Sequence, residues 1–245
     1  KNKMDYGLAF GQLWAEYERI ITNNGAIVLF AQTPFDKVLG ASKIDLLKYE
    51  YVWNKKRPTG FFNANYAPMK QHENILVFSK ASACYVKDKN NAMNFYPRDL
   101  VEVNKSIKRT KQNGNYDGSH YKLESKQKFT NYPKSILEFA HQTGLHPTQK
   151  PVALLRQLID LFTDEGDVVI DPVAGSGSTL VAAIRSNRKA YGFEIKKQFH
   201  IDATKWIKEE IQIVEDVKKY GFDKSRLEKI QPTLFTWKHA WDQQA

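Results

Sequence analysis

Two glycines and an acid in the second half of the chain have the types and spacing of a ligand-binding turn. Gly175 and Gly177 follow the apolar run 168–170, and Glu194 lies 19 residues after Gly175. Glycine lets the backbone turn sharply and approach a ligand closely, and a carboxylate after the next strand can accept hydrogen bonds from ribose hydroxyls. The order predicts a buried parallel strand, a glycine turn, a helix beginning near Leu180 and a second strand, with a pocket for an adenosine group.

Residues that are missing from this turn narrow the choice of ligand. A dinucleotide fingerprint needs a third glycine where Leu180 stands, and a phosphate-binding loop needs a lysine where Ser178 follows Gly177. An adenosine cofactor without phosphates fits better, and S-adenosylmethionine is the common one. The Gly-Ser-Gly tripeptide alone leaves open an ordinary turn between a strand and a helix.

A second segment, His146–Pro151, precedes a predicted helix. Pro151 suits the first helical turn, and a helical apolar stripe follows it at Leu154, Leu155, Leu158, Leu161 and Phe162. Free backbone N–H groups at a helix start favour a carboxylate such as that of a methionine moiety. Taken alone, the segment is more typical of a capped surface helix than of a binding site.

Together these motifs resemble the permuted β group of the DNA amino-methyltransferases. The resemblance rests on the order His-Pro-Thr-Gln-Lys-Pro, helix, Asp-Pro-x-Ala-Gly-Ser-Gly-Ser-Thr and Gly-Phe-Glu, with strand-like blocks at 25–30 and 72–78 ahead of them. It implies an α/β, Rossmann-like methyltransferase fold. Such a fold has a mostly parallel twisted sheet, helices on both faces and a basic target-recognition insertion.

The resemblance also implies which residues bind the cofactor. The family's cofactor segments correspond here to His146, Thr148, Lys150, Asp171, Pro172, Ala174, Gly175, Gly177, Ser178, Thr179 and Glu194. Val173 replaces an aromatic residue that is usual in the family, which affects only the expected packing around the cofactor.

The catalytic residues stay unknown, because the family's Asp-Pro-Pro-Tyr-type tetrapeptide is absent. All nine prolines are isolated. In the permuted order the tetrapeptide precedes the helix that contains Leu13, Trp14, Tyr17 and Ile20, so its expected place is upstream of Lys1. We expect an N-terminally incomplete chain, and the alternative is a naturally inactive methyltransferase-like module that binds DNA.

The expected organisation has three parts: a catalytic half at 1–79, a target-recognition insertion at 80–140, and an S-adenosylmethionine-binding half with C-terminal helices at 141–245. The net charge is +10 with a pI near 9.4, and residues 80–135 hold twelve Lys or Arg against five Asp or Glu. This surplus favours a polyanionic partner, double-stranded DNA.

Two basic clusters are predicted to contact that DNA. They comprise Lys55, Lys56, Arg57, Lys105, Lys108, Arg109 and Lys111. The first could equally be a basic turn after a half-buried strand at Tyr49–Trp53, and a charge run is often only a solvated loop.

Composition excludes several other classes of protein. The chain is 42% hydrophobic with a mean hydropathy of −0.56, and no apolar run reaches the roughly 18 residues of a membrane span. The single cysteine, Cys84, excludes an internal disulfide and suits a reducing, cytoplasmic location. The six histidines show no metal-site spacing, so no metal is expected.

The sequence therefore predicts an S-adenosylmethionine-dependent DNA methyltransferase that modifies an exocyclic base nitrogen, with adenine N6 favoured over cytosine N4. A restriction–modification context would add a companion endonuclease, and a homodimer is a further partner that the resemblance allows. The alternatives are the inactive DNA-binding module, or a methyltransferase that acts on RNA or protein.

Overall fold

The computed structural model describes residues 6–84, 86–108, 124–142 and 148–221. Its contacts separate a unit of residues 97–134 from a unit formed by residues 1–96 and 135–245. The smaller unit lies inside the predicted 80–140 insertion. Its role in target recognition stays a prediction.

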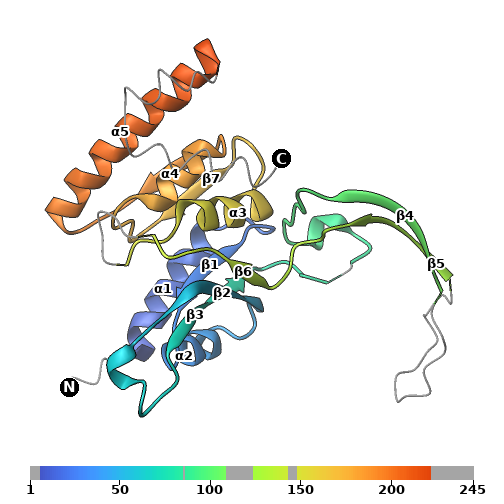
Figure 1. Cartoon of the computed structure of the whole chain (residues 1–245), viewed down its shortest axis with the longest axis horizontal. Helices are drawn as coiled ribbons and strands as arrows, with labels where there is room; N and C mark the ends of the chain where they lie inside the picture. The colour runs from blue at the N-terminus through green and yellow to red at the C-terminus, as the bar shows by residue number, and fades with distance from the viewer. Residues whose placement is uncertain (1–5, 85, 109–123, 143–147, 222–245) are drawn as a thin grey trace. The chain divides into compact units, whose positions relative to one another are not determined.

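The larger unit contains a four-stranded sheet in the order β1-β3-β2-β6 (Figure 1). The strands are β1 (Ile27–Ala31), β2 (Leu47–Thr59), β3 (Lys70–Phe78) and β6 (Ile136–Glu138). Strand β3 is antiparallel to both β1 and β2, and β6 is parallel to β2. Ala31 and Val52 both pair with Asn74, so β1 and β2 run in the same direction and lead to one edge of the sheet.

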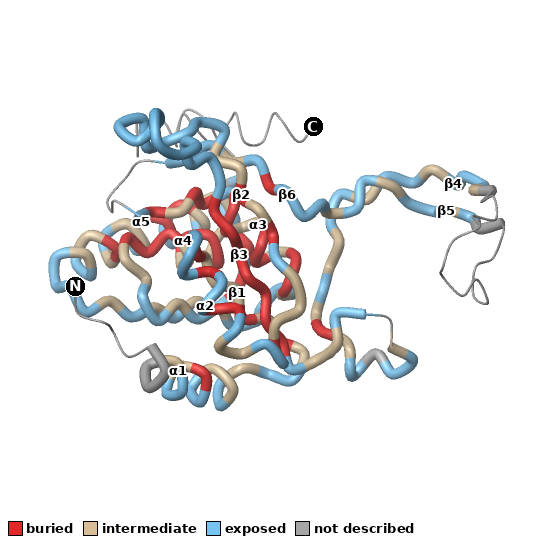
Figure 2. Tube along the Cα trace, turned by 90° about the horizontal axis from the view of Figure 1, so that it is seen from below, coloured by how far each residue is buried: buried red, intermediate tan, exposed pale blue. Residues whose placement is uncertain are grey.

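Both faces of this sheet are covered by helices. Leu76 and Phe78 face a cluster with α1 (Tyr6–Ile20) and α2 (Phe35–Ser42), whereas Ile75 and Val77 face α3 (Val152–Phe162). This alternation is the period of two that a strand imposes on its side chains. Buried residues accordingly gather around β1, β2, β3 and α3 (Figure 2).

The second half of this unit contains a parallel strand pair with helices packed on it. Strands β7 (Val168–Asp171) and β8 (Lys189–Gly192) flank α4 (Ser178–Arg185), and α5 (Lys197–Tyr220) follows. The predicted strand–turn–helix–strand order is therefore confirmed. None of the helices in the described ranges is long and apolar enough to cross a membrane.

The expectation that the strand at 168–170 is buried is wrong. Val168 is 51% exposed and Ile170 is 43% exposed. Only Val169 packs into the cluster shared by α3 and α4. Because side chains alternate along a strand, Val168 and Ile170 point to the opposite face, which the described residues leave open.

The unit of residues 97–134 contains strands β4 (Val101–Lys108) and β5 (Glu124–Thr130). They pair antiparallel, from Val101 opposite Thr130 to Lys108 opposite Glu124. The sequence had shown no strands here, because its polar side chains give no apolar alternation. Two short 3-10 turns, η1 (Phe61–Asn63) and η2 (Lys89–Asn91), complete the described elements.

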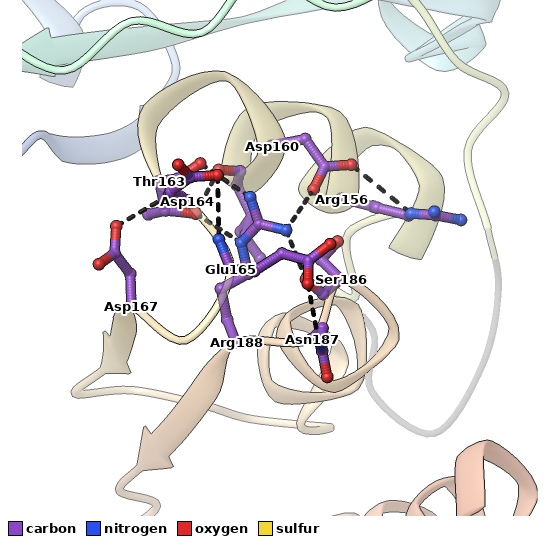
Figure 3. Close-up of polar contacts among 10 residues, drawn as sticks. Arg156, Asp160, Thr163, Asp164, Glu165, Asp167, Ser186, Asn187 and Arg188 are labelled. Carbon is purple, nitrogen blue, oxygen red and sulfur yellow. Dashed lines mark hydrogen bonds and ion pairs between the residues drawn. The ribbon is translucent and has the colours of Figure 1, made fainter. Parts of the chain in front are cut away.

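One buried arginine ties the end of α3 to the turn before β8 (Figure 3). Arg188 donates to the backbone oxygen of Thr163 at 2.7 Å and to its Oγ1 at 2.9 Å, and it also contacts the backbone oxygen of Ser186. Its guanidinium lies 3.1 Å from an Asp160 carboxylate oxygen. A planar fork of donors suits these several acceptors at once.

We expect Arg188→Met to lower the free energy of unfolding by about 3 kcal/mol, because it leaves buried acceptors and a carboxylate without their donor. Urea denaturation followed by circular dichroism measures this change. Arg156 also contacts Asp160, but at 3.6 Å and with a side chain 41% exposed, so Arg156→Met is the matched control and should cost less than about 1 kcal/mol. Equal losses in the two variants would contradict the assignment.

Candidate functional site

The glycine turn and the predicted ribose-binding acid lie together at the carboxyl ends of β7 and β8. The backbone N–H of Gly175 donates to Oε2 of Glu194 at 3.0 Å, and the N–H of Ala174 donates to the oxygen of Phe193 at 2.8 Å. Asp171 Oδ1 accepts the N–H of Val173 at 3.1 Å. Two segments 19 residues apart therefore form one loop structure at the edge where α/β folds bind ligands.

Both glycines of the turn adopt a left-handed backbone conformation. The φ angle is 53° at Gly175 and 81° at Gly177, a region that residues with a Cβ rarely enter. A Cβ on Gly177 would also lie 3.1 Å from Ile207 and 3.2 Å from Ala203 of α5. The turn thus needs glycine for conformation at both positions, and at Gly177 for close packing as well.

Apolar side chains stand exposed around this loop. Val173 is 80%, Phe193 63% and Ile195 98% exposed. Phe193 and Ile195 are the chain neighbours of Glu194, whose Oε1 also accepts the N–H of Lys196 at 2.8 Å. An apolar surface beside a hydrogen-bonding carboxylate has the chemistry that an adenine ring and its ribose require.

The other predicted residues of the loop line the start of α4. Ser178 is buried, Thr179 and Ala174 are half-buried, and Pro172 is exposed. The backbone N–H groups at the start of α4 give this end of the helix a partial positive charge.

A second cluster joins one predicted cofactor residue to one predicted DNA residue. The buried carboxylate of Glu73 receives Lys150 Nζ at 2.7 Å on one oxygen and lies 2.9 Å from Lys55 Nζ on the other. Gln32 Nε2 donates to the same carboxylate at 3.4 Å. We call Lys55, Glu73 and Lys150 the lysine–glutamate triad.

An aromatic ring lies beside each lysine of the triad. Lys55 Nζ lies 4.9 Å from the ring centroid of Trp53, and Lys150 Nζ lies 5.0 Å from that of Phe30. Trp53 is almost fully buried, donates its indole N–H to the oxygen of Phe139 at 2.8 Å, and stacks on His141. The faces of aromatic rings attract ammonium groups. Trp53 and Phe30 therefore help to hold the ammonium groups of Lys55 and Lys150 in place.

The surroundings of Glu73 favour its charged form. Burial alone would raise the pKa of Glu73, but the hydrogen bond and charge of Lys150, followed by those of Lys55, outweigh it and hold the pKa below the usual glutamate value. A carboxylate that is stabilised on folding in this way contributes to stability at neutral pH.

Sequence reasoning missed Glu73, although it had identified the strand that contains it. It also missed Asp36, a buried carboxylate that accepts a hydrogen bond from Asn74 Nδ2 at 2.7 Å and from the backbone N–H of Lys37 at 2.8 Å. The available signal was the placement of Glu73 and Asn74 at the start of a continuous apolar run, since buried polar groups need partners.

The remaining predicted residues lie outside the glycine turn and the lysine–glutamate triad. Thr148, Lys56, Arg57 and Lys105 are exposed, and Lys108 lies at the end of β4. His146, Arg109 and Lys111 fall outside the described residues, as does the C-terminal segment 222–245. Within the described ranges no group of three or more His, Cys, Asp or Glu could hold a metal ion.

We expect Glu73→Gln to destabilise the protein by about 2–3 kcal/mol at pH 7, because two partly buried lysines then face each other without the carboxylate. The folded-state pKa of Glu73 is lowered. Its contribution is therefore complete above the unfolded-state pKa of about 4.3 and is lost as the pH falls through the folded-state value. The difference in urea midpoint between the variant and the wild type should be smaller below pH 4 than at pH 7. Glu138→Gln, at an exposed position of β6, is the control, and a pH-independent gap would refute the account.

Solved structures of DNA methyltransferases share this architecture. The complex of M1.HpyAVI with SAM superposes with a TM-score of 0.55 at 21% identity, over 84% of each chain. The PvuII DNA methyltransferase, described as cytosine-N4-specific, gives a TM-score of 0.58 at 13% identity, over 86% of this chain and 77% of that one. At this identity the likeness shows the fold, and it confirms the predicted Rossmann-like methyltransferase class.

The relatives found by sequence are also named as methylases or methyltransferases. The DNA adenine methyltransferase YhdJ of Escherichia coli K12 is 29% identical over 243 residues, which cover 91% of this chain and 76% of that protein. Other curated relatives are matched over only 16–38% of their own length. The sequence model of the family described as DNA methylase matches residues 1–205, which include the glycine turn, Glu194 and the lysine–glutamate triad, and the chain therefore belongs to the N6/N4 DNA methylase family.

Proposed function

We propose that this protein transfers the methyl group of S-adenosylmethionine to an exocyclic amino nitrogen of a base in double-stranded DNA, with adenine N6 as the first choice. The observation that carries the proposal is the hydrogen bond between Gly175 N–H and Glu194. It joins a left-handed glycine turn to a carboxylate at the ends of two parallel strands.

The residues around that hydrogen bond fit the cofactor. Glu194 would accept the ribose hydroxyls, and the exposed apolar side chains of Val173, Phe193 and Ile195 would contact the adenine ring. The turn contains no lysine, which agrees with a ligand that has no phosphates. When bound, S-adenosylmethionine supplies an electrophilic methyl group on a sulfonium centre.

The chain's own residues would hold the rest of the cofactor and the DNA. His146, Thr148 and Lys150 are proposed to close over the methionine end, with Asp171, Pro172, Ala174, Gly175, Gly177, Ser178 and Thr179 around the turn. Lys150 is held by Glu73 at 2.7 Å, which fixes its ammonium group near the edge of the sheet. Within these 245 residues there is no Pro-Pro pair, so the catalytic tetrapeptide is assigned to none of them.

Adenine is favoured because YhdJ, a relative aligned over 91% of this chain, is named as an adenine methyltransferase. Cytosine N4 is the alternative, since PvuII shares the fold and carries that specificity in its name. A catalytically inactive DNA-binding module, or an enzyme acting on RNA or protein, would share the same cofactor loop.

Transfer of a tritiated methyl group from S-adenosylmethionine to unmethylated duplex DNA tests the proposal. We expect label on adenine when the product of the whole gene is used beside the 245-residue chain. Label from the gene product but not from the 245-residue chain would place the catalytic motif outside these residues. Binding of cofactor and DNA without transfer by either would favour the inactive module, and transfer to RNA in preference to duplex DNA would overturn the choice of substrate.

The proposed contact of Lys105, Lys108, Arg109 and Lys111 with phosphates gives a second expected outcome. Each phosphate contact contributes about 0.9 to the slope of log affinity against log salt concentration, so changing all four to glutamine should flatten that slope by about 3.6. Fluorescence anisotropy with a labelled duplex measures the slope. The double variant Lys205→Gln, Lys208→Gln, at exposed positions of α5, is the control. An unchanged slope in the fourfold variant would contradict the proposed phosphate contacts.

A further inference from the structure

The end of β2, the start of β3 and the connection between them are exposed throughout. Residues 56–72, which we call the hairpin tip, are all solvent-exposed, whereas Trp53 and Glu73 on either side of it are buried. The register of the two strands shifts here, so that residues 55–58 stand opposite Gln71 alone. Such bulges re-aim side chains and are often found beside functional sites.

Three aromatic rings project from this tip into solvent. Phe62 is 99% exposed, Tyr66 90% and Phe61 77%, and Met69 beside them is 37% exposed. Single exposed apolar residues are common, but a group this exposed within nine residues marks a binding surface.

Backbone hydrogen bonds hold the part of the tip that carries the rings. Gly60, with φ at 93°, starts the η1 turn. The N–H of Ala64 then donates to the oxygen of Phe61 at 3.0 Å, and the N–H groups of Tyr66 and Ala67 donate to the oxygen of Asn63, both at 2.9 Å. Because this backbone is already ordered, a partner that binds the rings meets a lower entropic cost.

The charge of the tip identifies the kind of partner. Residues 54–72 contain Lys55, Lys56, Arg57 and Lys70 and no acidic residue. Within the described part of the chain, no carboxylate lies within ion-pair distance of Lys56, Arg57 or Lys70. Exposed rings among cations match nucleic acid, in which rings stack on bases and cations contact phosphates. A second copy of the same tip would be repelled by its like charge.

We infer that the hairpin tip is a wedge that enters DNA, where Phe61, Phe62 and Tyr66 stack on bases left unpaired when the target base leaves the helix. Lys56, Arg57 and Lys70 contact the flanking phosphates. The tip ends one residue before Glu73, and the neighbouring Lys55 belongs to the lysine–glutamate triad. The wedge is therefore anchored at the site proposed above, and the inference rests on that proposed function.

The test compares the affinity of the full-length protein for two fluorescein-labelled 30-base-pair duplexes, one fully paired and one with three central unpaired adenines. We expect the wild type to favour the unpaired duplex by about tenfold, since stacking on a single base contributes about that much. The triple variant Phe61→Ala, Phe62→Ala, Tyr66→Ala should lose most of this preference and keep its affinity for paired DNA. Ile44→Ala, which removes another side chain 68% exposed, should change neither value.

Each other outcome has a definite meaning. A triple variant that keeps the tenfold preference overturns the wedge. If sedimentation shows a wild-type dimer that the triple variant converts to a monomer, the tip is a self-association surface and the wedge is also overturned. Methyl transfer by the wild type separates the two proposals: transfer to DNA with an unchanged preference in the triple variant removes only the wedge, whereas absence of transfer and of DNA binding removes the proposed function with it.

Discussion

The architecture depends on the burial of two faces of one short helix. Leu154, Leu158 and Leu161 of α3 pack against the β1-β3-β2 sheet, while Leu155 and Ile159 pack against α4 and the β7–β8 pair. The two groups of strands share no ladder among the described residues. Helix α3 packs against both groups, and Phe30 of β1 also reaches the cluster that contains Val169 and Ala190. Hydrophobic burial on both sides therefore fixes where the glycine turn lies relative to the edge that carries Glu73.

Electrostatic interactions then orient the charged side chains around Glu73 within this packed structure. A buried carboxylate is costly to desolvate, and one lysine would offset only part of that cost. Glu73 has two lysines, an amide donor and two aromatic rings around those lysines. Such an arrangement contributes little net stability compared with an apolar core, but it holds two ammonium groups in defined positions.

The features that could be predicted from the sequence are those whose physical requirement is local. A left-handed turn demands glycine at Gly175 and Gly177, and a helix start tolerates Pro151, so each leaves a readable pattern. The lysine–glutamate triad could not be predicted, because Lys55, Glu73 and Lys150 meet only through strand order and through α3. The exposure of Val168 and Ile170 depends on what lies beside β7, and the polar strands β4 and β5 lack the alternation by which strands are recognised.

One carboxylate shared by a proposed cofactor residue and a proposed DNA residue has a thermodynamic consequence. A ligand that draws Lys150 toward itself changes the charge that Glu73 presents to Lys55, and a ligand on Lys55 changes what Lys150 experiences. Linkage requires these two influences to be equal in free energy. Under the proposed function, the binding free energies of cofactor and DNA measured one at a time will then not sum to that of the ternary complex, and the difference is the coupling that passes through Glu73.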